Sequence, residues 1–240
     1  MKTILIIPAY NEESNIVKTY ESIIHYNNET GSEYDVIVIN DCSKDNTMML
    51  LKESKIPHIN LIHNLGIGGA VQTGYKYAYD EGYDVAVQFD GDGQHDVHYV
   101  KDIIQPICKG EADFVIGSRF INQETSEFKS SCARRVGIKL ISFFIKLVTG
   151  KRILDTTSGF RAVNRNIMMQ FANSYPTEYP EPITTTELLR KNYTVKEIAV
   201  SMNEREGGVS SIKAWKTVYY MINVILTVLI IKVRRYPRVK

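Results

Sequence analysis

Residues 3–12 read TILIIPAYNE, and this stretch decides the fold class. Its first five residues form a run rich in β-branched side chains, which is typical of a strand covered on both faces. Only four apolar residues stand directly before Pro8. A signal peptide needs an apolar stretch of about 7–15 residues, so the run predicts a buried strand instead. A polar segment, residues 8–12, follows the strand.

From this strand the chain continues in a βα rhythm. The predicted strands cover residues 3–7, 34–39, 60–63, 85–89 and 114–117, and the predicted helices cover residues 12–26, 47–54, 69–81 and 97–109. This alternation predicts an α/β fold with a mostly parallel, Rossmann-like sheet flanked by helices. Such sheets bind ligands beyond the carboxyl ends of their strands. Polar residues follow each strand there, and we expect them to converge on one rim: residues 8–12, Asp41, Asn64, residues 90–92 and residues 117–119.

The composition indicates a folded protein with no strong affinity for nucleic acid. The 240 residues are 44% hydrophobic and 23% charged, which suits one domain with a sizeable core. A formal net charge of +2 is too small to indicate nucleic-acid binding, which usually shows a strong basic excess. Cys42, Cys108 and Cys132 are far apart and odd in number, which favours a reducing cytoplasmic setting over a disulfide framework.

The pattern changes after about residue 120. Residues 122–131 are polar and predict a loop, and residues 134–148 predict a helix with a narrow polar stripe. An amphipathic helix of this kind packs into a core or lies in a membrane interface with its lysines at headgroup level. The sequence leaves both readings of residues 134–148 open.

Residues 213–240 predict an apolar amphipathic helix with a basic tail, beyond a main domain at residues 1–212. Fifteen uncharged residues separate Lys216 from Lys232. They span about 22 Å as a helix, less than the roughly 30 Å hydrocarbon core of a bilayer. An in-plane or oligomerising helix therefore fits at least as well as a spanning one, and a homo-oligomer is one expectation. The tail favours anionic lipids at a cytoplasmic membrane face through Lys232, Arg234, Arg235, Arg238 and Lys240.

The segment Asp90-Gly91-Asp92 follows the predicted strand at residues 85–89. Two carboxylates in that position suit a hard divalent cation, Mg²⁺ or Mn²⁺, which would also bind a substrate diphosphate. Gln94 can add a neutral oxygen ligand. The same letters also suit an ordinary turn, because Asp and Gly are favoured turn residues.

Other site types are disfavoured. His95, Asp96 and His98 lack the third, separated ligand of a zinc site. The glycines at residues 66–71 fail the dinucleotide fingerprint because Val71 stands at its last glycine, and the chain has no phosphate loop ending in Gly-Lys-Ser/Thr.

Taken together, the polar segments resemble the motifs of family 2 glycosyltransferases. The matching segments are residues 8–12, Asp41 with Ser43, Asp45 and Thr47, residues 64–70, residues 90–95, residues 117–119 and residues 155–161. The resemblance covers about residues 3–212. It is strongest to the dolichyl-phosphate mannosyltransferase-like branch and its bacterial polyprenyl-phosphate relatives.

The resemblance implies a GT-A fold, an inverting reaction and specific roles for residues. Catalytic roles fall to Asp92, Arg119 and Arg161. The nucleotide sugar is implied to contact Pro8, Ala9, Tyr10, Glu12, Asp41, Asn64, Gly69, Asp90, Gly91, Asp92 and Arg205, the last in a segment with Ser210 and Ser211. The metal is implied to bind Asp90, Asp92 and Gln94, and the acceptor phosphate to bind Arg119, Arg134, Arg135 and Ser158.

The implied activity is a metal-dependent transfer of a sugar from a nucleotide-diphosphate sugar to polyprenyl (undecaprenyl) phosphate. It would take place at the cytoplasmic face of a bacterial membrane and serve cell-surface polysaccharide or glycoconjugate synthesis. UDP is preferred over GDP, and the sugar is left open.

Two alternatives remain at this point. One is a family 2 enzyme that extends a lipid-linked oligosaccharide at a sugar hydroxyl. That reaction needs a general base, for which Asp155, Glu178 and Glu181 are candidates, whereas a phosphate acceptor is already a competent nucleophile. The other is an inactive module that binds nucleotide sugars.

Overall fold

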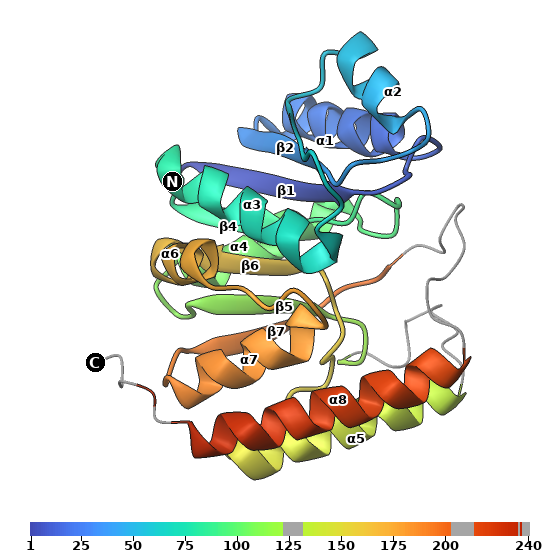
Figure 1. Ribbon diagram of the computed structural model, residues 1–240. Helices are drawn as coiled ribbons and strands as arrows, with labels where there is room; N and C mark the ends of the chain where they lie inside the picture. The colour runs from blue at the N-terminus through green and yellow to red at the C-terminus, as the bar shows by residue number, and fades with distance from the viewer. Residues whose placement is uncertain (122–131, 203–213, 235, 237–240) are drawn as a thin grey trace.

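The computed structural model describes residues 1–121, 132–202, 214–234 and 236. These residues form one seven-stranded sheet in the order β3-β2-β1-β4-β6-β5-β7, with helices on both faces (Figure 1). The strands are β1 (Thr3–Ala9), β2 (Tyr34–Asn40), β3 (His58–Asn60), β4 (Val85–Gln88), β5 (Phe114–Ser118), β6 (Arg161–Asn164) and β7 (Val195–Ala199). The helices are α1 (Ile16–Thr30), α2 (Thr47–Glu53), α3 (Gly66–Asp80), the 3-10 turn η1 (Val97–Tyr99), α4 (Val100–Cys108), α5 (Cys132–Thr149), α6 (Arg165–Asn173), α7 (Pro180–Arg190) and α8 (Ala214–Val233).

The predicted α/β fold with a mostly parallel sheet is confirmed. Strand β1 pairs in parallel with β2 on one side and with β4 on the other. Strand β6 is inserted antiparallel between β4 and β5, and β7 runs parallel to β5 at the edge. Every described strand except β6 therefore points its carboxyl end to the same side of the molecule.

All seven residues of β1 are buried, as the apolar run predicts. Ile4 and Ile6 pack into a cluster with α3, α5, α6, α7 and α8 on one face of the sheet. Leu5 and Ile7 pack into a second cluster with α1, α2 and α4 on the other face. Because successive strand residues point to opposite faces, an unbroken apolar run is what a doubly covered strand requires.

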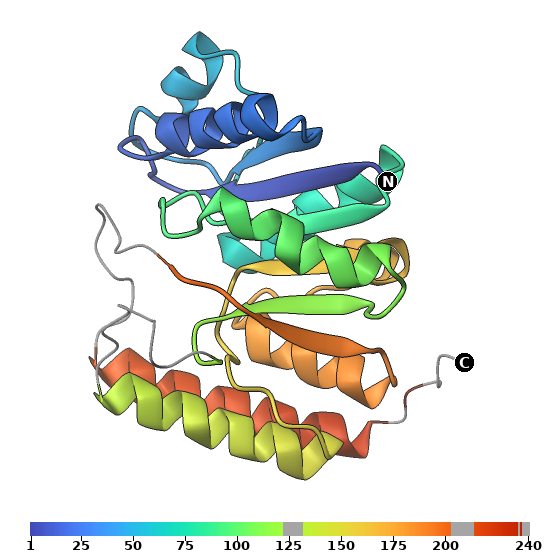
Figure 2. The ribbon, with the colours of Figure 1, turned by 180° about the vertical axis from the view of Figure 1, so that it is seen from behind.

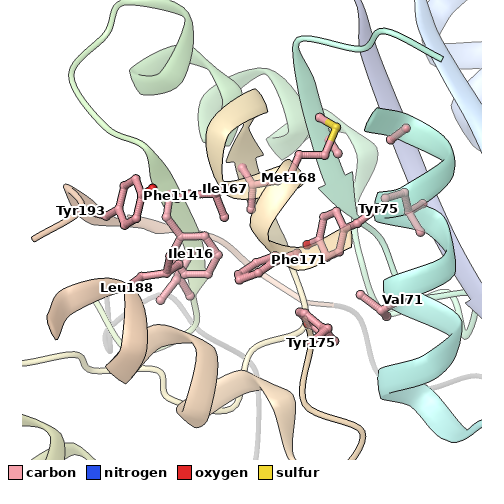
Figure 3. Close-up of a cluster of buried hydrophobic side chains, with 14 of the residues drawn as sticks. Val71, Tyr75, Phe114, Ile116, Ile167, Met168, Phe171, Tyr175, Leu188 and Tyr193 are labelled. Carbon is pink, nitrogen blue, oxygen red and sulfur yellow. The ribbon is translucent and has the colours of Figure 1, made fainter. Parts of the chain in front are cut away.

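The first cluster has an aromatic centre (Figure 3). Phe171 of α6 lies 5.2 Å from the ring of Tyr75 on α3 and 5.0 Å from that of Tyr175, centroid to centroid. Phe114 of β5 meets Phe171 edge-on at 6.4 Å. These rings join α3, α6 and the sheet into one core.

The element boundaries differ from the prediction where polar contacts replace the apolar pattern. Strand β3 ends at Asn60, where Asn40 Nδ2 donates to Asn60 Oδ1, and Ile62 beyond it is 85% exposed. Helix α1 begins at Ile16 instead of residue 12. The Glu12 N–H donates to the Thr47 hydroxyl, while the Glu12 carbonyl accepts from Asn15 N and Ile16 N in the turn that leads into the helix. Helix α3 begins earlier than predicted, at Gly66. The predicted loop at residues 122–131 lies outside the described residues.

Helices α5 and α8 lie side by side along the edge of the molecule beyond α7 (Figures 1 and 2). Ile141 and Ile145 of α5, with Val224 and Val228 of α8, belong to the first core cluster. Both helices thus bury one face in the core of the protein. The described residues contain no helix with the length and apolar character that spanning a membrane requires. The predicted boundary between residues 212 and 213 lies outside the described residues.

Gly74 tests the packing of α3 on β1. A Cβ atom at Gly74 would lie far inside van der Waals contact with Ile6 Cγ2. Helix propensity alone would make Gly74→Ala stabilising by about 1 kcal/mol, whereas overpacking costs about 1–3 kcal/mol. We expect the contact to dominate, so that urea unfolding shows a net loss of stability. Lys76→Ala, at an exposed position of the same helix, is the control and should leave the midpoint unchanged. A stabilised Gly74→Ala would contradict this packing.

Candidate active site

The loop after β1 and the loop after β2 are locked together at the carboxyl edge of the sheet. Asn11 N donates to Ser43 Oγ at 3.0 Å, and Lys44 N donates back to Asn11 Oδ1 at 2.8 Å. Glu12 N donates to Thr47 Oγ1 at 2.9 Å. Asn11 has a φ of 58°, a left-handed conformation that Asn tolerates better than most residues. The reciprocal bonds hold this half of the rim in one shape.

A cavity of about 350 Å³ opens between the two loops. It is lined by Asn11, Glu12, Glu13, Ser14, Asn15, Lys44 and Asp45. Burial raises the pKa of the Asp45 carboxyl, but hydrogen bonds from Thr47 and from backbone N–H groups, including that of Glu13, together hold that pKa below its usual value. Tyr10, 42% exposed, lies next to the cavity-lining Asn11 in the chain, whereas Pro8 and Ala9 are buried in β1.

Asp41 connects the rim to α3. Its side chain is buried, and its Oδ1 accepts a hydrogen bond from Leu65 N at 2.7 Å. Asn64 Nδ2 donates to the Asp41 carbonyl at 3.2 Å. Gly69 lies within α3, buried against Leu65. Asp41 and Asn64 thus fix the start of α3 at the rim, and their contact with a nucleotide stays a prediction.

Asp90, Gly91 and Asp92 follow the end of β4 as predicted. Asp92 is buried and its Oδ1 accepts from Gln94 N at 3.1 Å, across a turn in which Gly93 has a φ of 76°. Glycine adopts such a φ at no steric cost because it has no Cβ. The Asp90 side chain is 32% exposed.

The donor atoms at this turn fit a divalent cation. Asp90, Asp92 and Gln94 offer carboxylate and amide oxygens, the ligands that Mg²⁺ and Mn²⁺ prefer. Within the described residues, no group of three or more His, Cys, Asp or Glu side chains is arranged to hold a metal ion by itself. A Mg²⁺-type site does not need one, because it binds one or two carboxylates together with substrate phosphates.

Arg119, at the end of β5, forms a buried ion pair with Asp155. Arg119 Nε lies 2.7 Å from Asp155 Oδ2, and Nη2 lies 2.8 Å from Oδ1. Asp155 is fully buried, and Arg119 is 6% exposed. Arg119 Nη2 also donates to Thr157 Oγ1 at 3.0 Å. With both carboxylate oxygens bound to Arg119, Asp155 does not fit the role of a general base.

The loop that carries Asp155 is held in place by Glu197, a residue that the sequence analysis did not predict. Glu197 of β7 accepts hydrogen bonds from the backbone N–H groups of Leu154 and Asp155, both at 2.8 Å. These partners are more than 40 residues apart in the chain, so no local pattern marks the contact. Glu197 thereby ties the Asp155 loop to the edge strand.

Arg161, at the start of β6, is 1% exposed and connects to the start of α7. Its Nε donates to the Ser158 carbonyl at 2.6 Å, and its Nη1 donates to the Glu181 carbonyl and to Thr184 Oγ1, both at 3.0 Å. Burial raises the pKa of the Glu181 carboxyl, although Arg161 lowers it. A catalytic role of Arg161 stays a prediction; its described contacts position α7.

The remaining predicted site residues are only partly covered by the structure. The Ser158 hydroxyl is buried and accepts from Phe160 N at 3.3 Å. Arg135 is exposed on α5. Arg205, Ser210, Ser211 and the side chain of Arg134 lie outside the described residues. Their predicted contacts with diphosphate or acceptor phosphate stay predictions.

Comparison with known proteins identifies relatives over most of the chain. The family description "Glycosyl transferase family 2" matches residues 4–171. The UDP-N-acetylglucosamine–dolichyl-phosphate N-acetylglucosaminyltransferase of Methanococcus voltae is 37% identical over 183 residues, which cover 68% of this chain and 70% of the relative. The polyprenol monophosphomannose synthase of Mycolicibacterium smegmatis is 28% identical over 218 residues, covering 87% of this chain and 80% of the relative.

Solved structures share the fold at lower identity. Glucosyl-3-phosphoglycerate synthase from Mycobacterium tuberculosis, in complex with Mn²⁺, UDP and phosphoglyceric acid, superimposes with a TM-score of 0.69. The match covers 96% of this chain and 78% of that one at 17% identity. The predicted GT-A fold is confirmed by this likeness.

The Arg119–Asp155 pair predicts a large effect on stability. Asp155→Asn leaves the buried guanidinium without its counter-charge, and breaking a buried pair on one side costs about 3–5 kcal/mol. Urea unfolding should show that loss. The control is Lys196→Ala on β7. It breaks the exposed 2.8 Å ion pair with Glu111 and should leave the urea midpoint unchanged. Equal, small effects of both substitutions would show that the buried ion pair of Asp155 with Arg119 does not stabilise the fold.

Proposed function

Because this chain belongs to glycosyl transferase family 2, we propose that it moves a sugar from a nucleotide-diphosphate sugar to a polyprenyl phosphate. The proposed acceptor is supported by the names of relatives that match 68–88% of the chain. These names refer to dolichyl, polyprenol or undecaprenyl phosphate. UDP is the preferred nucleotide, and undecaprenyl phosphate the preferred acceptor. The reaction would serve cell-surface polysaccharide or glycoconjugate synthesis at the cytoplasmic face of a bacterial membrane.

The donor half of the site would be built on the locked loops and the β4 turn. The cavity beside Glu12 would take the nucleoside, next to Tyr10 and near Asp41. Asp90, Asp92 and Gln94 would hold Mg²⁺ or Mn²⁺, which neutralises charge on the departing nucleotide diphosphate when bound. The buried position of Asp92 supports this, since a carboxylate shielded from water interacts more strongly with a cation.

The acceptor half would work without a strong base. A phosphate monoester is largely dianionic at pH 7, because its second pKa is about 6, and its oxygen can attack the anomeric carbon directly. The ion pair of Arg119 with Asp155 supports a phosphate acceptor, because Asp155 is one of the three candidate bases and both of its carboxylate oxygens are bound to Arg119. Arg135 is exposed on α5, and its guanidinium would attract an acceptor phosphate there.

One observation favours a second candidate function, transfer to a sugar hydroxyl of a lipid-linked saccharide. The Glu181 carboxyl sits at the start of α7, and its raised pKa suits a group that accepts a proton. If this function holds, Glu181 would be the general base.

An apolar surface supports membrane association. The outward face of α5 exposes Val136, Leu140, Phe143 and Leu147, and the outward face of α8 exposes Tyr219, Ile222, Leu226, Ile230 and Val233. Lys139 and Lys146 stand beside the apolar residues of α5. Apolar faces flanked by lysines suit helices that lie in the plane of a membrane interface.

Acceptor choice can be tested directly. Wild-type protein is incubated with UDP- and GDP-sugars and with either undecaprenyl phosphate or a lipid-linked saccharide, and products are weighed by mass spectrometry. We expect a glycolipid from undecaprenyl phosphate, and a loss of at least about 100-fold in Asp92→Ala, equivalent to roughly 3 kcal/mol. Glu181→Gln should retain transfer to the phosphate. Product from the saccharide alone, lost in Glu181→Gln, would establish the second function instead.

Membrane association has its own test. We expect Phe143→Glu with Leu226→Glu to lower binding to vesicles containing anionic phospholipid by at least about tenfold, since burying each side chain contributes about 1.5–3 kcal/mol. Flotation of the protein with vesicles measures this. Met49→Glu replaces a similarly exposed apolar residue on α2, at the opposite end of the sheet, and should bind as wild type does (Figure 1). Undiminished binding by the double variant would argue against this surface.

A further inference from the structure

His95 is a buried histidine that the proposed reaction does not use. Its ring stacks on Phe160 at 4.7 Å and meets Phe89 edge-on at 5.3 Å, measured between centroids. Its backbone forms an antiparallel bridge with Met202, after β7. The ring is therefore held between the end of β4 and the start of β6, with little freedom to rotate.

Both ring nitrogens of His95 face Asp90. Asp90 N donates to His95 Nδ1 at 2.9 Å, and His95 Nε2 lies 3.3 Å from Asp90 Oδ2. Since Nδ1 accepts a hydrogen bond, the proton of the neutral ring must sit on Nε2, facing the carboxylate. The geometry thus defines one tautomer of the His95 ring, with its proton on Nε2.

A glycine borders Asp90 on another side. A Cβ atom at Gly159 would come within 2.8 Å of Asp90 Oδ2 and 3.0 Å of Oδ1. The loop between Asp155 and Arg161 therefore passes close to the carboxylate. Asp90 is confined between this loop and the His95 ring, although its side chain is 32% exposed.

From these contacts we infer that His95 is a positioning residue, which fixes the orientation of the Asp90 carboxylate for a divalent cation and the donor diphosphate. The inference rests on the proposed metal site. Side chains that orient a metal ligand through a hydrogen bond typically change metal affinity by about 10–100-fold when replaced. His98, three residues on, has no such role, since it is 70% exposed and its Nδ1 contacts Asp96 at 2.6 Å.

Two substitutions separate positioning from packing. His95→Phe keeps an aromatic ring between Phe89 and Phe160 but removes both polar contacts with Asp90. His95→Gln can place an amide N–H where Nε2 stood and so keeps a donor toward Oδ2. Mn²⁺ binding is measured for the full chain by electron paramagnetic resonance of free Mn²⁺, with UDP present and with GDP in a parallel series.

We expect Mn²⁺ to bind His95→Phe about 10–100-fold more weakly than wild type, with affinity partly restored in His95→Gln. His98→Ala is the matched control and should bind as wild type does. Urea unfolding of each variant verifies that the fold is retained. Unchanged Mn²⁺ affinity in folded His95→Phe overturns the positioning role alone. A wild-type protein that binds no Mn²⁺ overturns the metal site itself, and the inference with it.

The tautomer gives a test that needs no metal. In ¹⁵N NMR spectra of the metal-free protein at pH 7, His95 should show an unprotonated Nδ1 and a protonated Nε2. A proton on Nδ1 would overturn the inference, because the Asp90 N–H could then no longer donate to that atom.

Discussion

The burial of β1 on both faces is the constraint on which the rest of the structure depends. A strand that packs Ile4 and Ile6 to one side and Leu5 and Ile7 to the other needs helices above and below it. Such helices are the crossovers that make neighbouring strands parallel. Parallel strands in turn bring their carboxyl ends to one edge. The polar rim at Asn11, Asp41 and Asp90 is therefore a consequence of how the apolar centre is covered.

The two halves of the rim are held by different means. On the donor side, short polar loops bond to each other across about 30 residues of chain, as Asn11 does with Ser43 and Lys44. On the other side, a chain of charged groups runs from Glu197 through the Asp155 loop to Arg119. A buried charged network has little tolerance for the loss of one member, since the remaining charge stays buried without its partner. Rigidity at this edge is thus built into the fold before any ligand binds.

The sequence predicted β1, β2, β4 and β5 well, because each contains a continuous apolar run. Strand β3 contains none, and it overlaps its predicted range only at Asn60. The sequence predicted no strand or helix between residues 150 and 213, where the structure has β6, α6, α7 and β7. Strand β6 begins with Arg161, a charged residue buried at 1% exposure, and its pattern gives no sign of burial. Among site residues, the position of Asp90 and Asp92 at a strand end could be predicted, because both directly follow an apolar run in the sequence. The partners of Arg119 and His95 were not, because hydrophobic periodicity carries no information about which distant polar groups meet.

The helix at residues 134–148 had two readings, a core-packed helix and an interfacial one, and the structure gives reasons for both. Ile141 and Ile145 are buried, while Phe143 and Leu147, each two positions further along, stay exposed. Helix α8 repeats this with Val224 and Val228 inward and Leu226 outward. Gly137 lets the two helices approach closely, since a Cβ there would lie 2.9 Å from Met221 Sδ. Because α5 and α8 each pack one face into the core, their outward faces form one apolar surface on a rigid domain. Such a surface would favour binding of a lipid acceptor, because the apolar faces of α5 and α8 could hold its chain while the same rigid domain holds its phosphate.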